Sequence, residues 1–186
     1  GMSHTAAVQV LQRLRDQRRW SPIAWRVPGW NGQLPIPPVL AAAPTLTEVS
    51  RSALFAGVAD PRFGDQGTDR DDARWAANPH IRELVGDEPL TVFFRRDIHA
   101  GHELLDEVKQ AIASDNRIVA VVVNAIDEQL KGSLQVAVDY SRTPILPLEA
   151  LLSAADGAER AVLLVADHGH VAGDAMRVVP GRLPPG

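Results

Sequence analysis

The residues best suited to chemistry follow two apolar segments of the chain. After segment 161–166 the chain reads Asp167-His168-Gly169-His170, and the first acidic residue after segment 117–124 is Asp127. If both segments are strands of a parallel sheet, their carboxyl ends lie on one edge, so we expect these side chains to converge. Carboxylates and imidazoles are suitable ligands for zinc or manganese. The pattern predicts a metal site, and two metals about 4 Å apart would suit phosphoryl transfer.

A hydroxyl group at a helix start could complete such a site. The chain reads Pro44-Thr45-Leu46-Thr47 where a loop is expected to become a helix. A helix N-terminus offers free N–H groups to a phosphate, and a metal-bound Thr47 hydroxyl would be an activated nucleophile. Spacing alone favours the alternative interpretation, in which Thr47 serves as a helix cap. Arg51 could hold a phosphate oxygen through its fork of donors or form a surface salt bridge.

The elements that position these groups are expected to alternate along the chain. Near-continuous apolar strands separated by helices indicate a parallel sheet covered on both faces. The strands are predicted at 90–94, 117–124 and 160–166, and the helices at 4–18, 47–56, 101–114 and 147–155. The acidic stretch 58–78 predicts a mobile surface loop, and residues 178–186 form a Pro-rich tail. Together these elements predict one α/β domain over residues 1–186.

Composition limits the classes of partner. The 186 residues carry a net charge of −4, which gives non-specific nucleic-acid binding no support, although a nucleic acid could still be a phosphodiester substrate. The chain has no cysteine, which excludes disulfides and thiolate metal sites and fits a reducing cytoplasm. No apolar run reaches the roughly 18 residues of a membrane span, so we expect a cytoplasmic protein without membrane contact.

Three motifs together resemble the PglZ domain of the alkaline-phosphatase superfamily. They are the runs at 44–57 (PTLTEVSRSALFAG), 123–131 (VNAIDEQLK) and 164–170 (LVADHGH). They occur in the order of that family and span most of the chain. The resemblance implies an alkaline-phosphatase-like three-layer sandwich with a mostly parallel central sheet. It also implies phosphoesterase activity within the BREX and phage-growth-limitation defence systems of bacteria.

The resemblance assigns a role to each motif residue. Thr47 matches the nucleophile that is also a metal ligand, and Asp127 matches the acidic ligand of one metal. Asp167 and His168 match the pair that holds the other metal, which we expect to be zinc, with manganese or magnesium as alternatives. His170 belongs to the family's Asp-His-Gly-His signature, as a ligand or a phosphate contact. Arg51 is expected to contact the phosphate.

Two departures from the pattern shape the expectation for this chain. Lys131 stands where many superfamily members have a histidine ligand, so it is expected to bind phosphate or leave a weak metal site. The first strand, with its Asp ligand, and the C-terminal part of the fold are expected to be missing. We therefore expect an internal piece of a larger protein, with substoichiometric zinc and little activity. The alternative is a non-catalytic module that assembles with other defence proteins, and homodimerisation through an uncovered edge is also expected.

Overall fold

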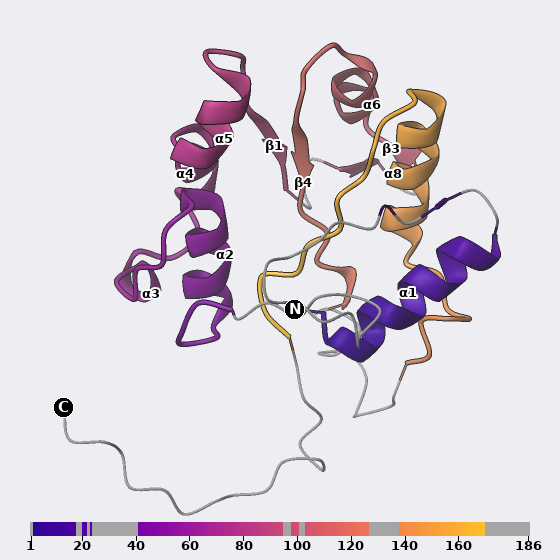
Figure 1. Ribbon diagram of the computed structural model, residues 1–186, viewed down its shortest axis with the longest axis horizontal. Helices are drawn as coiled ribbons and strands as arrows, with labels where there is room; N and C mark the ends of the chain where they lie inside the picture. Colours follow the sequence, from indigo (N-terminus) through magenta and orange to yellow (C-terminus); the bar gives the residue numbers. More distant parts are fainter. Residues whose placement is uncertain are drawn as a thin grey trace, which may run out of the picture.

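A computed structural model describes residues 2–17, 20, 21, 23, 41–94, 98–100, 103–126 and 138–169, with only the backbone of residues 99 and 100. The described chain is a mixed fold in which helices lie on both sides of a small central sheet (Figure 1). This agrees with the α/β class expected from the sequence. No helix in the described ranges is both long and apolar enough to cross a membrane.

The central sheet pairs two parallel strands. They are β1 (Thr91–Phe93) and β4 (Val119–Val121), with Thr91 opposite Val119 and Phe93 opposite Val121. Each strand lies within a segment predicted as a strand, so both predictions are confirmed, as is the parallel direction. Parallel strands need a crossover between them. Here that connection includes helix α6 (Asp106–Ala113).

The helix expected at 101–114 begins later than predicted. Glu103–Leu104 (β3) pairs antiparallel with His99–Ala100 (β2), and α6 follows. Leu104 keeps the apolar spacing of a helix because its side chain reaches the same buried cluster as Val108 and Ile112 of α6. When an apolar strand residue falls at the spacing of the helix that follows it, the sequence pattern alone cannot separate the strand from the helix.

Two further helices complete this side of the sheet. The predicted helices at 147–155 and 4–18 are confirmed as α8 (Leu146–Gly157) and α1 (His4–Asp16). Ser3 caps α1, since its Oγ accepts a hydrogen bond from the Ala6 N–H at 3.2 Å. The buried face of α1 packs against α8 and the chain before it; its core residues are Ala6, Val10, Leu14, Tyr140, Ile145 and Leu152.

The segment 58–78 is not the mobile surface loop predicted from its composition. It contains two short helices, which follow the predicted helix α2 and precede a third. The bounds are α2 (Thr47–Ala56), α3 (Phe63–Gln66), α4 (Asp71–Ala76) and α5 (Pro79–Val85). Phe63 and Trp75 are buried, and the Trp75 ring meets Phe55 edge-on with centroids 5.6 Å apart. The prediction failed because Asp71, one of the acidic residues that suggested a loop, is fully buried in an ion-pair network.

The apolar run 160–166 is not the buried strand that was predicted. It follows α8 as extended chain and has no strand pairing with the described residues. Leu164 packs against the α1 cluster, whereas Leu163 is 66% exposed and Val165 52% exposed. Apolar, β-branched residues favour an extended backbone. A fully buried strand also needs elements packed against both of its faces, and the described elements cover only one face of this segment.

Candidate functional site

Thr47 is the first residue of α2, where the sequence places a helix start. Leu46 occupies the N-cap position and makes no side-chain hydrogen bond to the first turn. The alternative in which Thr47 caps the helix is therefore wrong, because Thr47 lies one position inside it. Its side chain is half-buried. A helix start without a side-chain cap keeps N–H groups and positive potential available to an anion.

Arg51 lies one turn after Thr47, and its guanidinium is held by α4. Arg51 Nε donates to Asp71 Oδ2 at 2.8 Å, and the two side chains are 15% and 0% exposed. The guanidinium carbon also lies 5.9 Å from the centroid of the Phe94 ring. Of the two roles considered for Arg51, a salt bridge is present, but it is buried rather than on the surface. A phosphate contact stays a prediction for its other N–H groups.

Asp71 is the organising residue that the sequence analysis missed. Its Oδ1 accepts from Ser52 Oγ at 2.7 Å and from Arg74 Nη1 at 2.8 Å. Arg74 Nη1 also donates to the Gly67 carbonyl at 2.9 Å. One carboxylate thus ties α2 to α4 and fixes Arg51 beside the helix start. One signal in the sequence could have identified α4. Asp71 and Arg74 stand three residues apart, and an acid and a base at this spacing can pair on one face of a helix.

Asp167 and His168 lie together at the end of the extended segment. His168 Nδ1 is 3.0 Å from Asp167 Oδ2, and the side chains are 15% and 16% exposed for His168 and Asp167. The distance suits a hydrogen bond but the alignment does not, so Nδ1 is buried without a hydrogen-bond partner in the described structure. A buried imidazole nitrogen beside a carboxylate oxygen, with no bond between them, is an arrangement in which both lone pairs can serve one cation.

The start of α1 packs directly against this pair. The Met2 N–H donates to the His168 carbonyl at 3.0 Å. A Cβ placed on Gly169 would lie 3.7 Å from the Ser3 Cα, so the two backbones are in close contact. These contacts join the start of α1 to the chain that directly follows Asp167.

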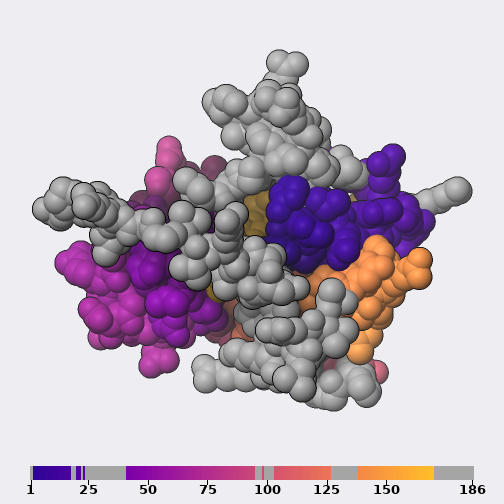
Figure 2. All heavy atoms as spheres, turned by 90° about the horizontal axis from the view of Figure 1, so that it is seen from below, coloured from indigo at the N-terminus to yellow at the C-terminus, as the bar shows by residue number. Residues whose placement is uncertain are grey.

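The segments predicted to converge reach one hydrophobic cluster. Val123 and Ile126, which follow β4, and Leu164 of the extended segment all pack against the buried face of α1. In Figure 1 the end of the 160–169 segment, the end of β4 and the start of α2 point toward the same end of the molecule. Figure 2 views that end and shows yellow atoms of the 160–169 segment between α1 (indigo) and α2 (purple). The three segments therefore end on one side of the described chain, without forming the common sheet edge that was predicted.

Some predicted site residues lie outside the described residues, namely Asp127, Lys131 and His170. Their predicted roles stay predictions. Within the described ranges, no three His, Asp or Glu side chains are grouped closely enough to hold a metal. Asp167 and His168 are therefore the predicted ligands that the described chain brings together.

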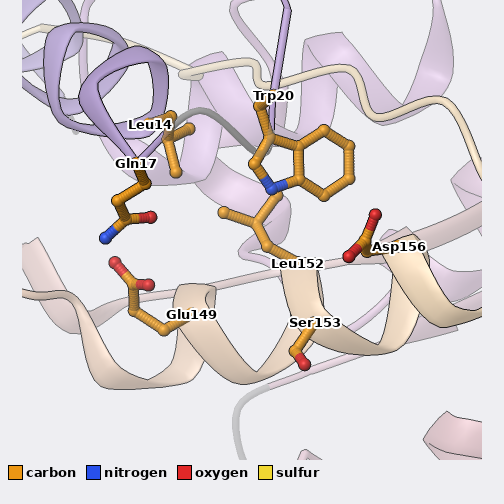
Figure 3. A pocket seen from close by; sticks show the side chains of 7 residues that line it. All are labelled: Leu14, Gln17, Trp20, Glu149, Leu152, Ser153 and Asp156. Atoms are coloured by element: carbon orange, nitrogen blue, oxygen red, sulfur yellow. The ribbon is translucent and has the colours of Figure 1, made fainter.

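A separate hollow lies between α1 and α8, away from every predicted site residue (Figure 3). It is shallow and open to solvent, and it is lined by Leu14, Gln17, Trp20, Glu149, Leu152, Ser153 and Asp156. The Glu149 carboxylate forms an ion pair with Arg13 at 2.9 Å, and it points toward the Gln17 amide in Figure 3. The hollow combines polar rim groups with little apolar enclosure, which is not typical of a small-molecule site.

Comparisons of the chain with protein-family models, with curated proteins and with solved structures found no match. The resemblance to the PglZ domain therefore stays a prediction from three motifs. The geometry of the Asp167–His168 pair and of the α2 start is the structural basis for a functional proposal.

Proposed function

We propose that this chain is a PglZ-type, metal-dependent phosphoesterase domain of a bacterial phage-defence system. Its scaffold would be the alkaline-phosphatase-like three-layer sandwich, of which β1, β4 and their covering helices form a part. The observation that carries the proposal is the buried His168 Nδ1, which has no hydrogen-bond partner in the described chain and lies 3.0 Å from the Asp167 carboxylate. Leaving a buried polar atom unbonded costs about 1–3 kcal/mol, so such an atom needs a role.

The donor types fit a divalent cation. Asp167 and His168 would hold zinc, manganese or magnesium, with Asp127 and His170 as the further ligands implied by the motifs. When bound, the cation supplies electrostatic stabilisation to the oxygens of the phosphoryl group.

Thr47 would act as the nucleophile on a phosphate monoester or diester. Its hydroxyl oxygen forms a bond to phosphorus while the ester oxygen leaves with a proton, and water then releases the phosphate and restores the hydroxyl. The uncapped α2 start offers N–H groups to the phosphoryl oxygens. Arg51, held by Asp71, and Lys131 would add positive charge.

A second candidate is a non-catalytic module that assembles with other defence proteins. The exposed side chains of Val162, Leu163 and Val165 favour it, because contiguous exposed apolar surface marks interaction sites. The two candidates differ in their dependence on Asp167. Assembly should survive Asp167→Asn, whereas hydrolysis should not.

The test is hydrolysis of bis-p-nitrophenyl phosphate with zinc, manganese or magnesium. It uses the metal-loaded full-length protein. The proposal predicts hydrolysis by the unaltered protein and its loss in Asp167→Asn, with activity retained in the matched control Asp87→Asn on an exposed turn. Activity that is equal in both variants would remove Asp167 from the site. No hydrolysis with any metal, together with partner binding that survives Asp167→Asn, would favour the assembly module.

A further inference from the structure

The guanidinium of Arg51 is bonded at one nitrogen and unbonded at the other two. Its Nε donates to Asp71 Oδ2 at 2.8 Å, and no described residue accepts a hydrogen bond from either Nη atom. The side chain is 15% exposed, so it is held largely within the protein and still reaches solvent. An arginine cannot lose its charge in a protein, so the N–H donors on the Nη edge suit an anionic acceptor.

The carboxylate that holds Arg51 is itself fixed. Asp71 has no exposed surface, and its Oδ1 accepts hydrogen bonds from Ser52 and Arg74. Rotation of the carboxylate would break these bonds, so Oδ2 stays on Arg51 Nε. One carboxylate faces two guanidinium groups in this network, which leaves an excess positive charge that favours an anion.

The guanidinium lies beside the carboxyl end of the parallel sheet. Phe94 directly follows β1, and the guanidinium carbon of Arg51 is 5.9 Å from the centroid of its ring. Side chains of a helix lean toward its N-terminus, so Arg51 covers the turn of α2 that begins with Thr47. Ligands of α/β proteins bind outside the carboxyl ends of the strands, which is where this arginine is held.

We propose that Asp71 is a positioning residue for an anion site, in which the Nη edge of Arg51 binds two oxygens of a phosphoryl group. The planar fork of a guanidinium matches two such oxygens, and an ammonium does not. Asp71 fixes the fork before the anion arrives, so binding does not have to order a long side chain. The choice of a phosphoryl group as the anion rests on the proposed function.

The first test is an NMR titration of the metal-free full-length protein with inorganic phosphate. Arg51→Lys, which keeps the charge but lacks the fork, and Asp71→Asn should each weaken phosphate binding by about tenfold or more. The matched control is Ser52→Ala, which removes one bond to the same carboxylate and keeps the Arg51 bond; its affinity should stay within about twofold. No binding by the unaltered protein, full affinity in Asp71→Asn, or an equal loss in Ser52→Ala would overturn the proposal. Should Asp71→Asn fail to fold, full affinity in Arg51→Lys would overturn it.

The second test asks whether Asp71 acts through Arg51. If it does, the double variant Arg51→Lys/Asp71→Asn should bind phosphate as weakly as Arg51→Lys alone, whereas losses that add would show that Asp71 acts elsewhere. Hydrolysis of bis-p-nitrophenyl phosphate by the metal-loaded full-length protein separates this inference from the proposed function. Phosphate binding that depends on Asp71 without any hydrolysis would support the anion site and count against the phosphoesterase. Hydrolysis whose kcat/KM is unchanged in Asp71→Asn would do the reverse.

Discussion

Arg51 of α2 and Asp71 of α4 form an ion pair in which Arg51 Nε lies 2.8 Å from a carboxylate with no exposed surface. Arg74 and Ser52 bond the other oxygen of the same carboxylate. Three side chains therefore bond to the buried Asp71 carboxylate. These bonds hold α2, the helix that begins with Thr47, against α4. The position of the proposed nucleophile depends on a residue more than twenty positions away in the sequence.

Replacing Asp71 should lower the free energy of unfolding, because the ion pairs that hold α2 to α4 are lost. Asp71→Ala leaves two guanidinium groups beside an empty space, and breaking a buried ion pair on one side costs about 3–5 kcal/mol. Asp72→Ala, at the exposed neighbouring position, should change the free energy of unfolding by less than about 0.5 kcal/mol. Urea denaturation of both variants measures the difference. Equal effects would show that the Asp71 network does not stabilise the fold.

Gly57 ends α2 in a conformation that other residues rarely adopt, with φ of 72°. A Cβ there would lie 2.7 Å from Asn78 Oδ1 and 2.9 Å from His80 Cδ2. Gly57→Ala should therefore cost the backbone strain of about 1–3 kcal/mol and a steric term in addition.

Thermal denaturation measures the loss in Gly57→Ala. The loss should exceed that of the left-handed backbone alone, because the added Cβ also meets Asn78 and His80. A melting temperature equal to that of the unaltered protein would contradict the close contact with Asn78.

The pH dependence of stability should include a contribution from Asp60. The Arg62 side chain, and then the Arg62 backbone N–H, lower the pKa of the Asp60 carboxyl below 3.8. A carboxyl with a lowered pKa in the folded state stabilises the fold above its unfolded pKa, and the contribution is lost as pH falls through the folded pKa. The melting temperature of Asp60→Asn should therefore lie slightly below that of the unaltered protein at pH 6 and converge with it in acid. A difference that persists in acid would rule out the ion pair as its cause.

The sequence best predicted the elements that can be recognised from the spacing of neighbouring apolar residues. The apolar spacing of Val108 and Ile112 identified a helix, and the β-branched run around Val119–Val121 identified a strand. The failures concern residues whose environment is set by distant chain. Asp71 is acidic and buried because Arg51 and Arg74 surround it, and Leu163 is apolar and exposed because no described element covers it. Composition alone suggests the opposite environment for each.

The candidate site was predictable to the same degree. The sequence predicted that Asp167 and His168 follow a buried strand, but in the structure they follow a segment that pairs with no described strand. The packing of the α1 start against His168 was not predicted, because it joins residues at opposite ends of the sequence. The sequence correctly placed Thr47 at a helix start. Only the backbone conformation shows that Leu46 is the N-cap and that Thr47 is the first residue of the helix.

Zinc binding should depend on His168. Isothermal titration should show zinc binding by the unaltered protein, and His168→Ala should weaken that binding by about tenfold or more. The control is His80→Ala, because His80 is exposed and its ring contacts the Gly57 carbonyl at 3.2 Å. Equal zinc affinities in the two variants would exclude His168 as a ligand.

The most direct test of the phosphoesterase proposal is a comparison of Thr47→Val with Thr45→Val. Both remove a hydroxyl group from the loop-to-helix junction, but Thr45 is exposed in the loop and Thr47 begins α2. The measurement is hydrolysis of bis-p-nitrophenyl phosphate by the metal-loaded full-length protein. We predict that Thr47→Val lowers the rate by roughly 10³-fold or more and that Thr45→Val leaves it unchanged. Full activity in Thr47→Val would contradict the proposal that Thr47 is the nucleophile.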